Sequence, residues 1–264
     1  MILSRLSRLD EDLTSRERLV LETLAITRVA TAEHIAHVVF GDEERATAHR
    51  LAHRHLQRLT KFGLVRRFAN SSSGRKSGPA GYVHVLTSAG LTLTRHASGP
   101  GAGQRRAWRP SPPKLRHWLA ICDLYVRLVI EARNGGPAVR QFLVEADARR
   151  SYWDSAGRRR LIQPDALVRL VAGGLELSWF VEIDLATESP AILANKCRAY
   201  CAFELSGLEQ ERHGIFPGVL FIVPGDDRAR RIARVIADQP PEARGLFRVT
   251  TEAAALAALR TSGS

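Results

Sequence analysis

One stretch of the chain carries many cations and no acid. Between Arg45 and Lys76 there are nine Arg or Lys residues and three His, without a single Asp or Glu. A surface helix ordinarily mixes both signs of charge, because opposite charges three or four residues apart attract and like charges repel. A segment that keeps only cations is relieved of its self-repulsion when phosphates neutralise it. This composition favours nucleic-acid binding over a merely solvated face.

The first half of this stretch has the spacing of a two-faced helix. Its apolar residues recur at three- and four-residue steps: Ala48, Leu51, Ala52, Leu56 and Leu59. Gly63 fits the end of such a helix. Leu64–Phe68 and Tyr82–Leu86 then alternate as strands do, on either side of a loop rich in Ser, Gly and Pro. This order predicts a winged helix-turn-helix, in which the helix enters the major groove and the strands form the wing.

Two roles follow for the cationic residues. We expect the following side chains to read bases: Arg45, His49, Arg50, His53 and Arg54. We expect the following side chains to neutralise phosphates: Arg58, Lys61, Arg66, Arg67, Arg75 and Lys76. The predicted partner is double-stranded DNA, and this binding requires no cofactor.

Carboxylates form a second candidate site in the C-terminal half. Pro164-Asp165 ends or interrupts one expected strand, and Glu182 and Asp184 alternate on the next, so they point to the same face. Carboxylates directed at one another are costly unless a cation lies between them. Mg²⁺ prefers such hard oxygen ligands. The metal ligands of this hypothesis are Asp165, Glu182 and Asp184.

The motif Pro164-Asp165, followed by Glu182-x-Asp184 with Thr187 and then by Lys196 and Tyr200, resembles the replication-relaxation family of plasmid and actinobacterial proteins. The resemblance implies an N-terminal winged helix and a C-terminal domain akin to the restriction-endonuclease fold. The active-site pattern of that fold is Pro-Asp…Asp/Glu-x-Lys. The resemblance also implies a role in plasmid replication initiation or relaxation, or in transcriptional control.

The sequence departs from the nuclease pattern at Asp184, where the pattern has Lys. Lys196 on the following helix can replace the missing lysine. A Mg²⁺-dependent DNA nuclease would then use Asp165 and Glu182 for the metal and Lys196 for the attacking water or the leaving charge. Alternatively, Asp184 and Lys196 form an ion pair in an inactive site, and we favour this interpretation. Enzymatic activity therefore stays open.

The remaining elements predict a second domain of α/β class. At 264 residues the chain is long enough for two domains. We expect the winged helix over residues 1–97, a Gly/Pro/Arg linker over 98–113 and a nuclease-like domain with a central mixed sheet over 114–264. The expected strands are Val139–Ala146, Leu161–Leu170, Leu177–Leu185, Gly218–Val223 and Leu246–Val249.

Composition adds expectations about the environment. The formal net charge of +12 favours a polyanionic partner. Three cysteines without a CxxC motif fit a reducing compartment. The N-terminus lacks the apolar core of a signal peptide, and no stretch approaches the roughly 20 apolar residues of a membrane span. We expect a cytoplasmic protein with no membrane partner. A homodimer is left open, as is a third reading in which the chain is a dimeric protein-interaction module.

Overall fold

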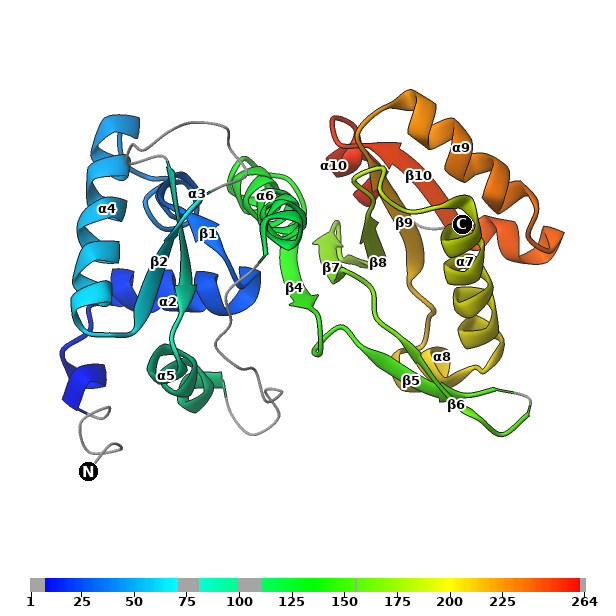
Figure 1. Ribbon diagram of the computed structural model, residues 1–264, viewed down its shortest axis with the longest axis horizontal. Helices are drawn as coiled ribbons and strands as arrows, with labels where there is room; N and C mark the ends of the chain where they lie inside the picture. The colour runs from blue at the N-terminus through cyan, green and yellow to red at the C-terminus, as the bar shows by residue number, and fades with distance from the viewer. Residues whose placement is uncertain (1–7, 71–80, 99–110, 155, 262–264) are drawn as a thin grey trace. The chain divides into compact units, whose positions relative to one another are not determined.

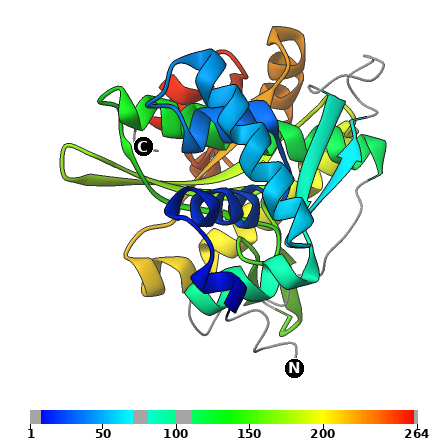
Figure 2. The same cartoon turned by 90° about the vertical axis from the view of Figure 1, so that its left-hand side faces the viewer.

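A computed structural model describes residues 8–70, 81–98, 111–154 and 156–261 (Figures 1 and 2). The chain divides into two compact units, Met1–Ile130 and Glu131–Ser264. The division falls near the end of helix α6 (Pro112–Arg133). The sequence analysis expected the second domain to begin earlier, at residue 114. Most of the linker expected over 98–113 lies outside the described residues.

The first unit is built from helices and a small antiparallel sheet. Its elements are α2 (Ser15–Thr27), β1 (Ala30–Thr31), α3 (Ala32–Val39), α4 (Arg45–Lys61), β2 (Val65–Ala69), β3 (Tyr82–Leu86), α5 (Ser88–Ser98) and most of α6. The strand order is β1-β3-β2, and both pairings are antiparallel. Strand β3 has the predicted bounds, whereas the two-residue β1 was not predicted.

A capping box begins helix α2. Thr14 Oγ1 accepts a hydrogen bond from the Glu17 backbone N–H, and the Glu17 carboxylate accepts one from the Thr14 backbone N–H, which completes a capping box. Leu19 of this helix faces solvent, with 45% of it exposed. The buried side of α2 instead carries Val20, Leu21 and Leu24. Residues three and four apart lie on one face of a helix, and the face that packs into the core is the one that includes Leu21 and Leu24.

Helix α6 joins the core of the first unit. Its Cys122 and Val126 are buried among side chains of α2, α3 and α4. His34 of α3 also holds it, since Nε2 lies 2.8 Å from Asp123 Oδ1 and Nδ1 lies 3.1 Å from Cys122 Sγ. This packing explains why the division between the units follows Ile130.

The second unit is a mixed α/β structure with a central five-stranded sheet. The strand order is β10 (Phe247–Thr251), β9 (Gly218–Val223), β8 (Leu175–Ile183), β7 (Ala166–Ala172) and β4 (Ala138–Val144). β10, β9 and β8 are parallel, and β7 and β4 are antiparallel to their neighbours. Helices α7 (Pro190–Leu205) and α9 (Asp226–Ala237) cover one face of this sheet (Figure 1). The expected central mixed sheet is thus confirmed.

Two strands before β7 form a separate hairpin. β5 (Arg150–Trp153) pairs antiparallel with β6 (Arg159–Ile162). The single strand expected over Leu161–Leu170 is therefore two, interrupted at Pro164-Asp165, and β5 was not predicted. The short helices α8 (Leu208–His213) and α10 (Ala255–Leu259) and the 3-10 turn Pro241–Leu246 complete the unit.

Within the described part of the chain, none of the helices has the length and apolar character that crossing a membrane requires.

Candidate nucleic-acid interface and carboxylate cluster

Helix α4 presents cations along one side because its other side is buried. Glu44 caps its N-terminus by accepting a hydrogen bond from the Ala46 N–H. The residues buried on the inner side are Ala48, Ala52, Leu56 and Leu59. The residues that are exposed between them include Arg50, Arg54, Gln57 and Lys61. Figure 2 shows α4 at the front of the first unit, with β2 and β3 beside it.

Three of these cations have no acidic partner. Among the described residues, Arg50, Arg54 and Lys61 form no ion pair, and Arg50 only donates to Thr47 Oγ1 at 3.1 Å. Arg45 lies 3.6 Å from Glu33, but 84% of its side chain is exposed. An exposed pair of this kind contributes roughly 0–1 kcal/mol and exchanges readily for another partner. The exposed side of α4 therefore keeps its positive charge.

Arg58 is engaged elsewhere. Its Nη1 donates to both carboxylate oxygens of Glu17 at 2.9 Å, and Nη2 donates to the Asp12 carbonyl at 3.2 Å. The Glu17 side chain is fully buried, and the guanidinium lies 4.9 Å from the centre of the Phe62 ring. The side chain expected to contact a phosphate thus ties α4 to α2. Sequence spacing gave no sign of this, because Glu17 lies in another helix.

The strands of the hairpin separate the two arginines that the sequence grouped together. Arg67 lies opposite His84 of β3, and its guanidinium lies 4.9 Å from the centre of the Tyr82 ring. Arg66 lies opposite Val85 and so points to the other face of the hairpin. Both arginines are exposed. Arg75 and Lys76, also expected to contact phosphates, lie outside the described residues.

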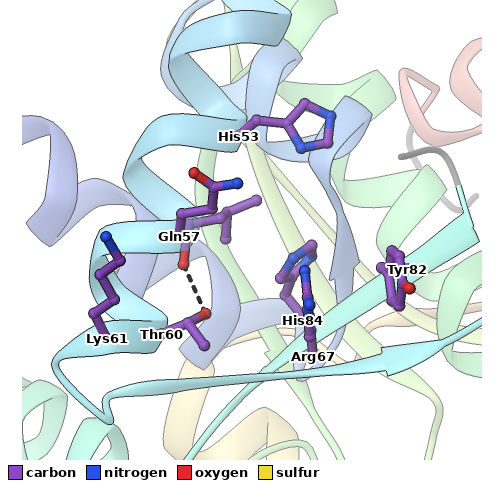
Figure 3. A pocket seen from close by; sticks show the side chains of 8 residues that line it. His53, Gln57, Thr60, Lys61, Arg67, Tyr82 and His84 are labelled. Carbon is purple, nitrogen blue, oxygen red and sulfur yellow. Dashed lines mark hydrogen bonds between the residues drawn. The ribbon is translucent and has the colours of Figure 1, made fainter. Parts of the chain in front are cut away.

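A groove of about 760 Å³ lies between α4 and the hairpin (Figure 3). Gln57 and Lys61 come from the helix, and Arg67, Tyr82 and His84 come from the strands. No Asp or Glu is among its described lining residues, which also include His53, Leu56 and Thr60. The groove therefore joins the cations of α4 to one cation of the hairpin.

The histidines of the groove stay neutral near pH 7. Burial lowers the pKa of His84 to about 4, and the nearby His53 and Arg67 lower it as well, against a hydrogen bond with the Ala30 backbone. Burial and the neighbouring His49 lower the pKa of His53. Nε2 of His53 and Nδ1 of His84 have no hydrogen-bond partner among the described residues.

The carboxylate cluster of the second unit forms where β7 begins and β8 ends. Asp165 Oδ2 accepts a hydrogen bond from the Ile183 N–H at 2.7 Å. Glu182 is buried, and it accepts hydrogen bonds from Tyr200 Oη at 2.6 Å and Lys196 Nζ at 2.9 Å. Ser189 caps α7 and Pro190 starts it, which sets the helical turn that carries Lys196 and Tyr200. The structure brings Asp165, Glu182 and Lys196 together.

Charge and burial shift both partners of the central pair. Burial raises the pKa of Glu182 to about 7, and the charge of Asp165 raises it too, against the effects of Lys196 and Tyr200. Burial alone would lower the pKa of Lys196, but the charge of Glu182 and hydrogen bonds to Glu188 and Glu182 raise it. Lys196 therefore stays protonated beside a carboxyl group that titrates near neutral pH.

Asp184 is held apart from this pair. Arg228 of α9 donates to Asp184 Oδ2 from Nε at 2.8 Å and from Nη2 at 2.5 Å, and the Ala186 N–H donates to Oδ1. The expected ion pair between Asp184 and Lys196 is absent from the described contacts, where Lys196 pairs with Glu182 and Glu188. In the described part of the chain, no three His, Cys, Asp or Glu side chains are placed to hold one metal ion. The arrangement around Asp184 does not fit the three-carboxylate Mg²⁺ site.

Comparison with known proteins relates the chain to a family. The family model for replication-relaxation proteins matches residues 21–219, which include α4, the groove and the carboxylate cluster. No curated protein and no solved structure matches the chain significantly. Because the match covers most of the sequence, the chain belongs to the replication-relaxation family.

Proposed function

We propose that the first unit is a winged helix-turn-helix that binds duplex DNA. In support, α2, α3 and α4 precede an antiparallel hairpin, and β1 adds a third strand in the order β1-β3-β2. α4 is then the recognition helix in the major groove, and β2 and β3 are the wing. Membership of the replication-relaxation family supports a role for this binding in plasmid replication or relaxation.

The observation that carries the proposal is the unpaired charge on α4. Phosphates bind cations by releasing counterions, and cations already engaged with protein acids contribute little to that release. Arg50, Arg54 and Lys61 are exposed and have no ion pair within the described residues. The acid-free groove extends this charge to Arg67.

The side chains divide into three sets under this proposal. Those that face bases are Arg45, His49, Arg50, His53 and Arg54. Those that contact phosphates are Lys61, Arg66 and Arg67, with Arg75 and Lys76 of the wing. Arg58 belongs to neither set, because it holds the buried Glu17.

Removing charge from the exposed side of α4 tests the proposal. We expect Arg50→Ala with Arg54→Ala to weaken binding to a target selected from a random duplex library. Each lost bidentate base contact costs about 1–3 kcal/mol, and each lost phosphate contact lowers the slope of log affinity against log salt by about 1. Ala favours helix, so the fold should survive. Titrations by fluorescence anisotropy at several salt concentrations measure both quantities.

A matched control removes the same charge from another helix. Arg231 and Arg234 are exposed on α9 of the second unit, so their replacement by Ala lowers the net charge equally. We expect that variant to bind DNA nearly as wild type does. Equal losses in the two double variants would mean that net charge alone attracts DNA, and the recognition-helix assignment would be abandoned.

We propose further that the second unit is a nuclease-like domain without nuclease activity that serves assembly or partner contact. Its order of β4, β7, β8, α7 and β9, with Asp165 before β7 and Glu182 on β8, agrees with the restriction-endonuclease fold. The other two carboxylates of the cluster already have cationic partners: Glu182 pairs with Lys196, and Asp184 pairs with Arg228. A buried carboxylate that is neutralised by protein has little left to offer a metal ion.

Incubation of supercoiled plasmid with Mg²⁺ or Mn²⁺ tests this second proposal. We expect no nicked or linear product from wild type, and none from Asp165→Ala. Cleavage by wild type that Asp165→Ala abolishes would overturn it and identify Asp165, Glu182 and Lys196 as nuclease residues. Cleavage that survives in the variant would instead reveal a contaminating enzyme, which a control preparation from the same host detects.

A further inference from the structure

The hairpin β5–β6 has one face in the core and one face in solvent. Antiparallel partners point to the same side, so Tyr152 and Arg160 share one face, and Trp153 and Arg159 share the other. Tyr152 and Ile162 are each only 4% exposed. Trp153 is 65% exposed and Leu161 is 56% exposed. In Figure 1 the hairpin extends past the end of α7, with its tip away from the sheet.

The inner face fixes the hairpin to the second unit. The Tyr152 ring lies 5.3 Å from the Phe203 ring, and its hydroxyl donates to the Ala199 carbonyl. Arg150 pairs with the buried Glu209 at 3.1 Å. An isolated two-stranded ribbon is marginally stable in water, so these contacts are what order it. The exposed face is consequently presented on a rigid support.

The turn of the hairpin is ordered by one carboxylate. Asp154 accepts hydrogen bonds from the backbone N–H groups of Ala156 and Arg158. It also forms ion pairs with the side chains of Arg158 and Arg160. The hydrogen bonds from the Arg158 backbone and the Arg160 side chain hold the pKa of this carboxyl well below its usual range. Asp154 therefore stays ionised and engaged, and does not neutralise the outer face.

The outer face combines a bare indole with uncompensated positive charge. Residues 149–161 contain five arginines and one carboxylate. Arg159, beside Trp153, has no acidic partner among the described residues and contacts only Ser151 Oγ, at 3.5 Å. Arg149 is exposed and donates to Gln163 Oε1. Trp153 therefore presents an exposed indole ring on the same face as Arg159.

We propose that this face binds single-stranded nucleic acid, with a base stacked on Trp153 and its phosphates on Arg159 and Arg149. Aromatic side chains beside arginines on an exposed ribbon provide both parts of such a site, a π-face for any base and cations for the backbone. A paired base is already stacked on both sides, so the indole selects unpaired strands. The hairpin lies in the second unit, and this site does not depend on duplex binding by α4.

Strands with and without bases test the stacking. The Arg50→Ala, Arg54→Ala variant of the full chain serves as background, so that α4 contributes little. A labelled thymidine oligonucleotide and an abasic strand of the same length and charge are titrated by fluorescence anisotropy. We expect tighter binding of the thymidine strand. Adding Trp153→Ala should weaken it about 5- to 150-fold, the equivalent of one stacked base, while Trp153→Phe should keep most of the affinity.

Leu175→Ala provides the control, because Leu175 is also an exposed apolar residue of the second unit, at 71%. We expect it to bind both strands as the background does, and Arg159→Gln to weaken both strands alike. Equal affinity for thymidine and abasic strands, or unchanged binding after Trp153→Ala, would overturn the proposal. So would a change of sedimentation coefficient in Trp153→Ala with strand binding intact, since that result would assign the face to protein contact.

Discussion

Arg54 and Arg58 lie one turn apart on α4 and have different roles. Arg54 is exposed, whereas Arg58 neutralises the fully buried Glu17. Burial would raise the pKa of Glu17, but hydrogen bonds from Thr14 and the charge of Arg58 lower it. Removing Arg58 would leave a buried carboxylate without its cation, which is strongly destabilising. A loss of DNA binding in an Arg58 variant would therefore report on folding, and Arg54 is the informative position.

His84 makes the first unit sensitive to acid. Its pKa is about 4 in the folded chain, against 6.5 for a free side chain. Between these values the unfolded state binds the proton and the folded state does not, so stability falls as pH drops below about 6.5. Full protonation costs about 3 kcal/mol, and pH 5 already costs about 2 kcal/mol. We expect urea unfolding to show that wild type loses more stability between pH 7 and pH 5 than His84→Gln does.

His213→Gln controls for general effects of histidine removal. His213 is 36% exposed on α8 of the second unit, so its replacement should leave the pH dependence of wild type in place. If His84→Gln instead retained the full loss of stability between pH 7 and pH 5, the acid sensitivity would have to come from other groups.

At the scale of elements, α4 and β3 were predictable because a single periodicity runs through each. The alternation in Tyr82–Leu86 gives β3 its observed bounds, and the spacing of Ala48, Ala52, Leu56 and Leu59 gives the buried side of α4. Helix α4 buries one face against a core, and this burial imprints its period on the sequence, whereas β3 is buried on both faces from Val83 to Leu86. The cation stripe followed from the same spacing.

The hairpin β5–β6 was not predictable in this way. Only Tyr152 and Ile162 bury their side chains, so the surrounding Arg, Ser and Asp residues show no apolar alternation. Trp153 is the largest apolar residue of β5 but is exposed, so the sequence suggests burial of the face that in fact lies in solvent. A strand whose order comes from two anchors and an aspartate turn leaves little trace in hydrophobic periodicity.

The carboxylate cluster was half predictable, for a reason of distance along the chain. Asp165, Glu182, Lys196 and Tyr200 belong to adjacent elements, and their motif located them. Arg228 is on α9, beyond the next strand, and no local pattern links it to Asp184. Ion pairs between distant segments are set by tertiary packing. Proximity in the sequence suggested an Asp184–Lys196 pair, whereas in the structure Asp184 pairs with Arg228 and Lys196 pairs with Glu182.

The whole chain has a net charge of +12, and two of its surfaces carry arginines that form no ion pair among the described residues. The acid-free side of α4 and the outer face of the β5–β6 hairpin belong to different units, and each unit has its own buried core. Separate cores allow two binding surfaces to be supported independently. Loss of one unit's packing then need not remove the other surface.

Separate cores also predict separate unfolding of the two units. Leu56 and Leu193 are each 1% exposed, the first in the core with α2 and α3, the second in the core beneath α7. Truncating a buried Leu to Ala costs about 2–5 kcal/mol, on the order of 10 °C for a unit of this size. We expect two calorimetric transitions, with Leu56→Ala lowering the midpoint temperature of only one and Leu193→Ala lowering that of only the other.

The two substitutions are chemically identical, so each is the control for the other. A single transition whose midpoint is lowered by both substitutions would show that the units unfold as one cooperative body. Both binding surfaces would then be lost in the same unfolding step.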